Sequence, residues 1–287
     1  MAGGGSRAKL IGAVILVGVL TACGGGGGAD KRGFGRGDVP IENFTAEQIF
    51  ERGEFEMARS RYEDAAFYFS EIERLYPYGE WARRALIMQA YAYHEDEDYE
   101  SSRSAAQRFI DFYPSDGDAA YAQYLLALSY YDQIDEVGRD QGLTFQALQA
   151  LRKVIEQYPD SEYARSAILK FDLAFDHLAA KEMEIGRYYL KRKHYAAAVN
   201  RFRTVVEDFQ TTSHTAEALH RLVESYLSLG LPEQAQTAGA ILGHNYRSTE
   251  WYEDSYKMLT GRGLELEAVG DSWLSKIYRQ VILGKWL

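Results

Sequence analysis

Five copies of a short aromatic motif constrain the fold of this chain more than any other feature. Three copies pair a tyrosine with proline and two keep only the aromatic residue: Tyr76-Pro77, Tyr113-Pro114, Tyr158-Pro159, Phe209-Gln210 and Tyr246-Arg247. Successive copies lie 37, 45, 51 and 37 residues apart, and periods of this size are typical of helical repeat arrays. Because proline lacks the N–H that a helix needs, each motif is expected to end a helix.

Residues of recurring size precede each motif at fixed distances. The position eleven residues before the aromatic residue holds Ala65, Ser102, Ala147, Ala198 and Ala235 in the five copies. The position seven before it holds Phe69, Ala106, Leu151, Phe202 and Gly239. The position four before it holds Ile72, Phe109, Val154, Val205 and Leu242. Spacings of four and three place these residues on one face of a helix. The small residues let a neighbouring helix approach, and the bulky ones fill the groove beside it.

A second helix is expected before each of these helices. In four of the copies a small or apolar residue stands twelve positions before the small residue of the pattern, at Gly53, Ala90, Gly186 and Val223. The third copy fits this upstream pattern poorly. With its closing proline, the pattern resembles the tetratricopeptide repeat, a helix-turn-helix unit of 34 residues. We therefore predict an all-α solenoid with five such repeats over residues 45–247 and further helices over residues 248–287.

Polar residues mark where several helices should begin. Thr45 and Gln48 have the spacing of a capping box, which would open the first repeat. Ser161 and Thr249 follow the third and fifth motifs and offer side-chain oxygens to cap the next helix.

Three stretches depart from the regular repeat. Residues 132–144 are polar and should lengthen the connection into the third repeat, while residues 164–192 keep helical register and predict an extended helix. Residues 272–287 combine apolar side chains with Lys276 and Arg279. An amphipathic basic helix of this kind could dock on a partner or a membrane surface, or it could cap the last repeat.

The N-terminus has the features of a lipoprotein precursor. Cations precede Leu10 to Leu20, eleven residues without a charge, and this run is too short to span a bilayer. The following tetrapeptide Leu20-Thr21-Ala22-Cys23 resembles a bacterial lipobox. We expect residues 1–22 to be a signal peptide and Cys23, the single cysteine, to carry N-acyl and S-diacylglycerol lipid. The alternative is a plain cleaved signal with an incidental cysteine.

The residues after Cys23 predict a tether and a location. Glycines dominate residues 24–37, so residues 23–44 should form a flexible lipidated tether. Lipoproteins retained in the inner membrane commonly carry aspartate after the cysteine, and Gly24 stands there instead. This favours the periplasmic face of the outer membrane.

Charge and motif content exclude several classes of function. The chain has 32 Lys+Arg and 42 Asp+Glu, a net charge of −10, which argues against nucleic acid as a partner. It has no P-loop, no Gly-x-Ser-x-Gly elbow and no H-E-x-x-H zinc motif. The acidic run His94–Asp98 lacks the spacing of a calcium loop and is read as a solvated turn. We therefore expect no enzyme activity, no metal and no cofactor apart from the lipid.

Stacked repeats instead offer a concave surface to peptides or partner domains. The first helices of the first three repeats would contribute arginine and tyrosine side chains: Arg52, Arg59, Arg84, Tyr91, Tyr124 and Tyr131. Tyrosine offers an apolar plate with a polar tip and arginine can bind a carboxylate. The mixture would suit a peptide with aromatic residues and a terminal carboxylate. Alternatively, these tyrosines pack between helices.

The ordered set of motifs resembles the BamD family, the repeat lipoproteins of the outer-membrane β-barrel assembly machinery, from about Thr45 to Leu231. The matching stretches are Leu75–Gly79, Ala90–Tyr93, Arg108–Ile110, Arg139–Gln141, Tyr158–Tyr163, Tyr188-Tyr189 and Ala198–Arg201. At Gln141 the chain departs from the family, which has proline there.

The resemblance implies a non-catalytic periplasmic scaffold that binds BamA, the barrel subunit, and other assembly lipoproteins, and that receives unfolded outer-membrane proteins. It places Arg201 at the BamA contact, with Arg139 and Asp140 as further partner-binding candidates. The alternative for Arg201 is a surface arginine paired with Glu207 or Asp208. The alternative function is a repeat lipoprotein that coordinates peptidoglycan synthesis or envelope constriction.

Overall fold

The computed structural model describes residues 39–137, 139–270, 272–277 and 279. The chain divides into two units, residues 1–43 and 44–287. The described part of the first unit is residues 39–43, which include the short 3₁₀ helix η1 (Ile41–Asn43). The predicted signal peptide, Cys23 and the tether up to residue 38 lie outside the described residues.

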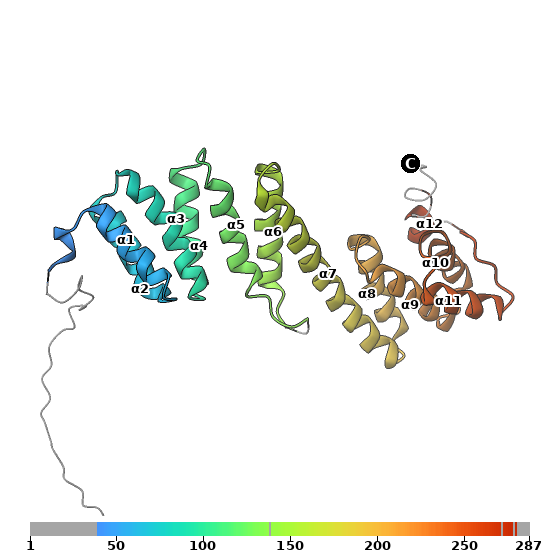
Figure 1. Ribbon diagram of the computed structural model, residues 1–287. Helices are drawn as coiled ribbons and strands as arrows, with labels where there is room; N and C mark the ends of the chain where they lie inside the picture. Colours follow the sequence, from blue (N-terminus) through green and yellow to red (C-terminus); the bar gives the residue numbers. More distant parts are fainter. Residues whose placement is uncertain (1–38, 138, 271, 278, 280–287) are drawn as a thin grey trace, which may run out of the picture. The chain divides into compact units, whose positions relative to one another are not determined.

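Five consecutive helix pairs make up most of the second unit (Figure 1). They are α1 (Ala46–Met57) with α2 (Tyr62–Leu75), α3 (Glu80–Glu95) with α4 (Tyr99–Phe112), α5 (Ala119–Tyr131) with α6 (Gly142–Gln157), α7 (Glu162–Lys191) with α8 (Tyr195–Asp208), and α9 (Thr215–Ser228) with α10 (Pro232–Asn245). Each helix packs against the helices before and after it. No strand occurs among the described residues. The prediction of an all-α array with five repeats is confirmed.

The aromatic residue of each motif is the C-cap of the second helix in its pair. In all five, φ lies between −125° and −132° and ψ between 32° and 52°. The backbone N–H of each C-cap residue donates to the carbonyl of the residue four positions earlier, at 2.8–3.1 Å. That residue is the one at the last position of the repeat pattern, four before the aromatic residue. Phe209 and Tyr246 adopt this conformation without a following proline. The aromatic residue, and not the proline, is therefore the constant part of the stop signal.

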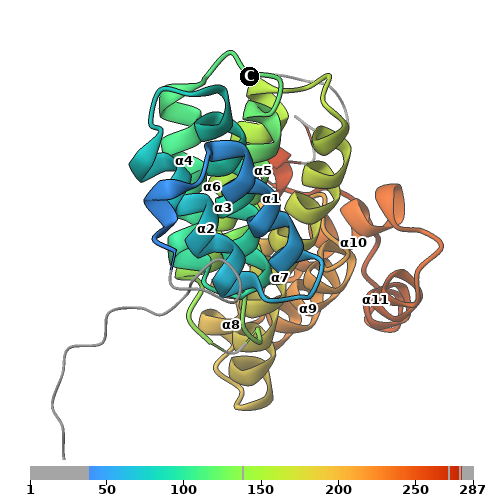
Figure 2. The ribbon, with the colours of Figure 1, turned by 60° about the vertical axis from the view of Figure 1, so that its left-hand side comes forward.

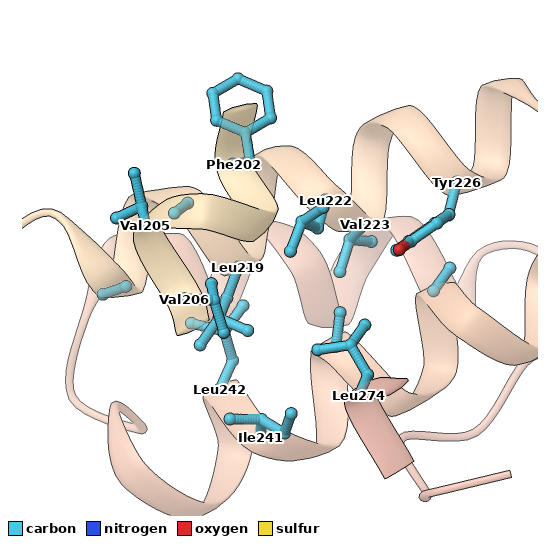
Figure 3. Packing of buried hydrophobic residues seen from close by; sticks show 14 of the residues in the cluster. Phe202, Val205, Val206, Leu219, Leu222, Val223, Tyr226, Ile241, Leu242 and Leu274 are labelled. Carbon is cyan, nitrogen blue, oxygen red and sulfur yellow. The ribbon is translucent and has the colours of Figure 1, made fainter. Parts of the chain in front are cut away.

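The small and bulky residues of the pattern form the buried faces between helices. The small residues at the first position of the pattern are all fully buried. Around the fourth and fifth pairs, Phe202 and Val205 of α8 pack with Leu222 of α9 and Leu242 of α10 (Figure 3). The neighbouring α7 approaches α8 so closely that a Cβ added at Gly186 would lie 2.8 Å from two ring carbons of Phe202.

The two expected irregularities of the repeat are present. Helix α7 has 30 residues, about 45 Å, and confirms the extended helix predicted over residues 164–192. The polar connection is shorter than predicted, because α6 already begins at Gly142 and Thr144 is buried within it. The connection spans residues 132–141 and lies between α5 and α6, inside the third repeat, which corrects the expectation that it leads into that repeat.

The helix starts agree with the predictions at two positions out of three. The Thr45 hydroxyl accepts from Gln48 N–H at 3.3 Å, and Gln48 Oε1 accepts from Thr45 N–H at 3.0 Å, so the capping box is complete. The Thr249 hydroxyl accepts from Tyr252 N–H at 3.3 Å and caps α11. Ser161 is the N-cap residue of α7, but its hydroxyl donates to the carbonyl of Tyr158 at 2.8 Å and accepts no N–H of the first turn, so the predicted side-chain cap is absent.

The chain after α10 returns to cover the last pair. Helix α11 (Glu250–Thr260) packs on α9 and α10, and the short α12 (Trp273–Ile277) packs on α10. Leu274 is fully buried in the same apolar cluster as Leu242 (Figure 3). The Thr237 hydroxyl donates to Val269 C=O at 3.2 Å and accepts from Val269 N–H at 3.1 Å. This packing is what the capping interpretation requires; residues 280–287 lie outside the described part of the chain.

Candidate binding surfaces

Two of the three predicted partner-binding residues, Arg139 and Arg201, contact successive residues in α7, and Asp140 follows Arg139 in the chain. From α8, Arg201 Nη1 donates to both carboxylate oxygens of Glu182, at 3.0 and 3.3 Å. From the connection between α5 and α6, the carbonyl of Arg139 accepts from Lys181 Nζ at 3.4 Å. Lys181 and Glu182 are successive residues of α7. The third and fourth repeats therefore present these predicted residues around one short stretch of helix.

Charged atoms at this surface remain available to a partner. The Arg201 side chain is 42% exposed although it pairs with Glu182. Arg139 lies 3.2 Å from Asp135 in an exposed pair, and Asp140 is exposed as well. Exposed pairs contribute little to stability, on the order of 0–1 kcal/mol, so these side chains can exchange partners at small cost.

The alternative pairing considered for Arg201 is wrong. Glu207 instead pairs with Arg203, at 2.9 Å and one helical turn away. Arg201 points to α7 and not along its own helix, and its partner Glu182 follows Lys181, which contacts the Arg139 carbonyl. Glu182 is thus a residue of this surface that the sequence analysis missed.

Gln141, where the chain departs from the BamD pattern, holds the turn that carries Arg139 and Asp140. Its Nε2 donates to the carbonyls of Val137 at 3.2 Å and Arg139 at 3.3 Å. A side-chain amide here ties the backbone down through hydrogen bonds, whereas proline would do so by restricting φ. The departure therefore preserves an ordered turn.

A second candidate surface lies on α1, around Phe55. This ring is 46% exposed, and the guanidinium carbons of Arg52 and Arg59 lie 4.9 and 5.2 Å from its centroid. Arg52 also pairs with the buried carboxylate of Glu56 at 2.6 Å. Arg59 is exposed and forms no ion pair with any described residue. An exposed aromatic ring between two guanidinium groups can accept an aromatic side chain and a carboxylate together.

The remaining predicted peptide-binding residues do not join this cluster. Arg84 is exposed, and its guanidinium carbon lies 5.0 Å from the Phe50 ring and 4.8 Å from the Trp81 ring. Tyr91 is half-buried, and burial, with the nearby Glu95 carboxylate, raises the pKa of its hydroxyl.

Tyr124 and Tyr131 pack between helices. The Tyr124 ring is buried and stacks on Tyr163 at 5.5 Å, and its hydroxyl lies 2.6 Å from Ser166 Oγ. Tyr131 is half-buried beneath Lys170, whose Nζ lies 4.9 Å from the ring centroid. Tyr124 is therefore a core residue, which corrects the expectation that it faces a peptide.

Phe55 was missed because it lies off the apolar stripe of α1. The buried residues of this helix are Ile49, Phe50, Gly53 and Glu56. They recur at helical spacing, and Phe55 does not fall on the positions of that face. A large aromatic residue on the polar face of an amphipathic helix was the available signal.

The described part of the chain shows neither a metal-binding cluster nor a membrane-spanning helix. It contains no group of three or more His, Cys, Asp or Glu side chains placed to hold a metal ion. None of its helices is both long enough and apolar enough to cross a bilayer.

Comparison with known proteins identifies the family. Residues 42–241 match the family model described as YfiO, outer membrane lipoprotein. The chain is 45% identical over 252 residues to outer membrane protein assembly factor BamD of Caulobacter vibrioides, covering 88% of this chain and 82% of the relative. It is 39% identical over 251 residues to BamD of Rickettsia prowazekii, covering 88% and 96%. The chain therefore belongs to the YfiO family of outer membrane lipoproteins, together with these BamD assembly factors.

Proposed function

We propose that this protein is a non-catalytic outer membrane protein assembly factor, held by lipid on Cys23 at the periplasmic face of the outer membrane. Its similarity to the outer membrane protein assembly factors BamD of Caulobacter vibrioides and Rickettsia prowazekii supports the assembly role. The lipobox-like tetrapeptide that ends at Cys23 supports the anchor. Depleting the protein should lower the amount of folded outer-membrane barrels, and normal barrel levels after complete depletion would contradict the proposal.

The surface around Arg139, Asp140, Glu182 and Arg201, here the partner-binding surface, binds a periplasmic domain of the barrel subunit BamA. The observation that supports this most strongly is that the Arg139 backbone carbonyl and the Arg201 guanidinium contact Lys181 and Glu182, two successive residues of α7. Two separate repeats are thereby joined in one charged surface, which a folded domain can cover. An Arg201 guanidinium that remains 42% exposed can donate to a partner carboxylate.

A charge swap separates a partner contact from an internal ion pair. Arg201→Glu should abolish co-purification with BamA, because it removes the guanidinium and repels Glu182. The double variant Arg201→Glu with Glu182→Arg restores an internal pair with reversed polarity. If Arg201 binds BamA, the double variant folds normally but still fails to capture BamA. Recovery of capture in the double variant would show that the internal pair alone matters.

The Phe55 surface takes the aromatic C-terminus of an unfolded barrel protein. A peptide with an aromatic C-terminal residue should bind more tightly with a free carboxylate than as the C-terminal amide. Arg59→Gln should abolish that difference and weaken the free-acid peptide by roughly tenfold, since a charge-assisted hydrogen bond contributes about 1.5–3 kcal/mol. Arg165→Gln, at another exposed arginine, is the matched control. Equal binding of acid and amide by the unaltered protein would contradict this assignment.

A further inference from the structure

A concentration of positive charge distinguishes the turn between α7 and α8 from the rest of this acidic chain. The 22 residues Ile185–Val206 contain six Lys and Arg and no Asp or Glu, although one residue in seven is acidic overall. Three of the six cations are paired with carboxylates from elsewhere: Arg187 with Glu217, Arg201 with Glu182 and Arg203 with Glu207. The other three are consecutive, at Lys191, Arg192 and Lys193.

These three cations and the next residue, His194, have no acidic partner within the part of the chain that the structure describes. All four are exposed, and none forms an ion pair with a described residue. The equivalent turn between α3 and α4 has the opposite composition, Glu95–Asp98. Since both turns adopt the same left-handed conformation at their third residue, φ 64° at Lys193 and 62° at Glu97, the geometry of the turn does not require basic residues.

Apolar surface accompanies the charge at this end of the fourth and fifth repeats. Tyr188 is 52% exposed, and the guanidinium carbon of Arg192 lies 4.3 Å from its ring centroid. The neighbouring turn between α9 and α10 exposes Leu229 and Leu231. An open groove of about 580 Å³ lies between the two turns, lined by residues 193–197 together with Tyr189 and Leu229.

The turn between α7 and α8 projects beyond the ends of the neighbouring helices. It is the lower end of the yellow-brown hairpin in both Figure 1 and Figure 2. A projecting turn can reach a flat surface before the acidic remainder of the repeats does. Exposed cations combined with tyrosine and leucine are the composition that favours the headgroup region of an anionic bilayer.

We propose that the turn Lys191–His194, with Tyr188, Leu229 and Leu231, is a contact site for the phosphate headgroups of an anionic phospholipid membrane. The site would orient the repeats at the membrane, which a glycine-rich tether cannot do. It relies on the proposed anchor only for the presence of a membrane nearby, and the binding itself needs no lipid on the protein. An acidic protein partner is less favoured, because the cations lie on a projecting turn and line no enclosed pocket with fixed donors.

Vesicle flotation of the full-length chain with Cys23→Ser tests the site without the anchor. Vesicles would contain phosphatidylcholine alone or with phosphatidylglycerol. The tip variant Lys191→Gln, Arg192→Gln, Lys193→Asn removes three charges, and asparagine tolerates the left-handed position. The control Arg165→Gln, Arg247→Gln, Arg262→Gln removes three exposed cations elsewhere. The signal peptide is identical in both variants, so their difference reports the turn.

The tip variant should lose the phosphatidylglycerol-dependent part of binding, by on the order of 100-fold at low salt, since each cation near an anionic surface contributes about 1 kcal/mol. The control variant should bind as the parent does, and circular dichroism should show both variants folded. Equal losses in the two variants would mean that only net charge matters and would overturn the proposal. A tip variant that floats like the parent but no longer co-purifies with BamA would also overturn it and assign the turn to a protein partner.

Discussion

The approach of α7 to α8 at Gly186 makes a quantitative prediction about stability. Replacing Gly186 by alanine places a Cβ 2.8 Å from two carbons of the Phe202 ring. Carbon atoms are in favourable contact at about 3.5–4.0 Å, so the new methyl group is roughly 1 Å too close. Phe202 is fully buried, and its ring cannot turn away without displacing its neighbours. Gly53 faces Phe69 in the first repeat in the same way, with two ring carbons 2.8 and 2.9 Å from an added Cβ, so the close approach recurs in two repeats.

Two opposing effects determine the size of the change. Glycine to alanine within a helix gains about 1 kcal/mol of intrinsic helix propensity. Overpacking a close-packed core costs typically about 1–3 kcal/mol, and the upper part of this range applies where the neighbour is a fully buried ring. We therefore expect Gly186→Ala to lower the free energy of unfolding by about 1–2 kcal/mol. Gly117→Ala, at a turn with nothing within 4 Å, should change it by less than about 0.5 kcal/mol.

Urea denaturation followed by circular dichroism measures these changes. Repeat arrays can unfold in parts, so amide hydrogen exchange in α7 and α8 should locate the loss. Combining Gly186→Ala with Phe202→Leu should recover part of the stability, with a coupling of at least about 0.5 kcal/mol because the two side chains share one space. If Gly186→Ala alone were as stable as the parent chain or more stable, the close helix approach would be refuted.

Two further predictions concern the fifth repeat. Burial by itself would raise the pKa of Glu217, but hydrogen bonds and charge from Arg187 and Arg221 outweigh it and hold the pKa below its ordinary value of 4.5. The ionised Glu217 carboxylate therefore stabilises the fold fully above pH 4.5. This stabilisation is lost as the pH falls through the lower pKa that Glu217 has in the folded protein. Thermal melts across this acidic range should show a steeper loss for the parent than for Glu217→Gln, and parallel curves would contradict the assignment. Trp273 Nε1 donates to the Tyr226 hydroxyl at 3.1 Å. Trp273→Phe should therefore lower the free energy of unfolding in urea by about 1 kcal/mol and speed amide hydrogen exchange in α12. Unchanged exchange would show that this hydrogen bond does not hold α12 in place.

The helix boundaries were predictable because their determinants are local. The C-cap aromatic residues and the apolar positions seven and four residues before them lie within one helix, so periodicity along the chain reveals them. Two of the five copies lack proline and still end the helix in the same conformation. A search that required the full aromatic-proline pair would have found only three repeats.

The surfaces were less predictable because they depend on how helices pack. Helix α5 has buried residues at nearly every position from Ala119 to Ser129, so no period distinguishes its inner face from its outer face. Tyr124 was therefore assigned to a groove although it lies in the core. Similarly, the partner of Arg201 is Glu182, nineteen residues earlier on another helix, and spacing within α8 pointed to Glu207 instead.

Helix α7 connects the two surfaces that we propose for the later repeats. Lys181 and Glu182, which contact the partner-binding residues, precede the basic turn by about ten residues, or roughly 15 Å along one continuous helix. No break in the helix separates the two regions, since hydrogen-bonded helical structure runs from Glu162 to Lys191. A partner domain bound at the middle of α7 and a membrane met at its end would therefore be held at a fixed spacing. The length of α7, which departs most from the repeat, thus has a physical consequence: it carries the partner contact and the proposed membrane contact on one rigid element.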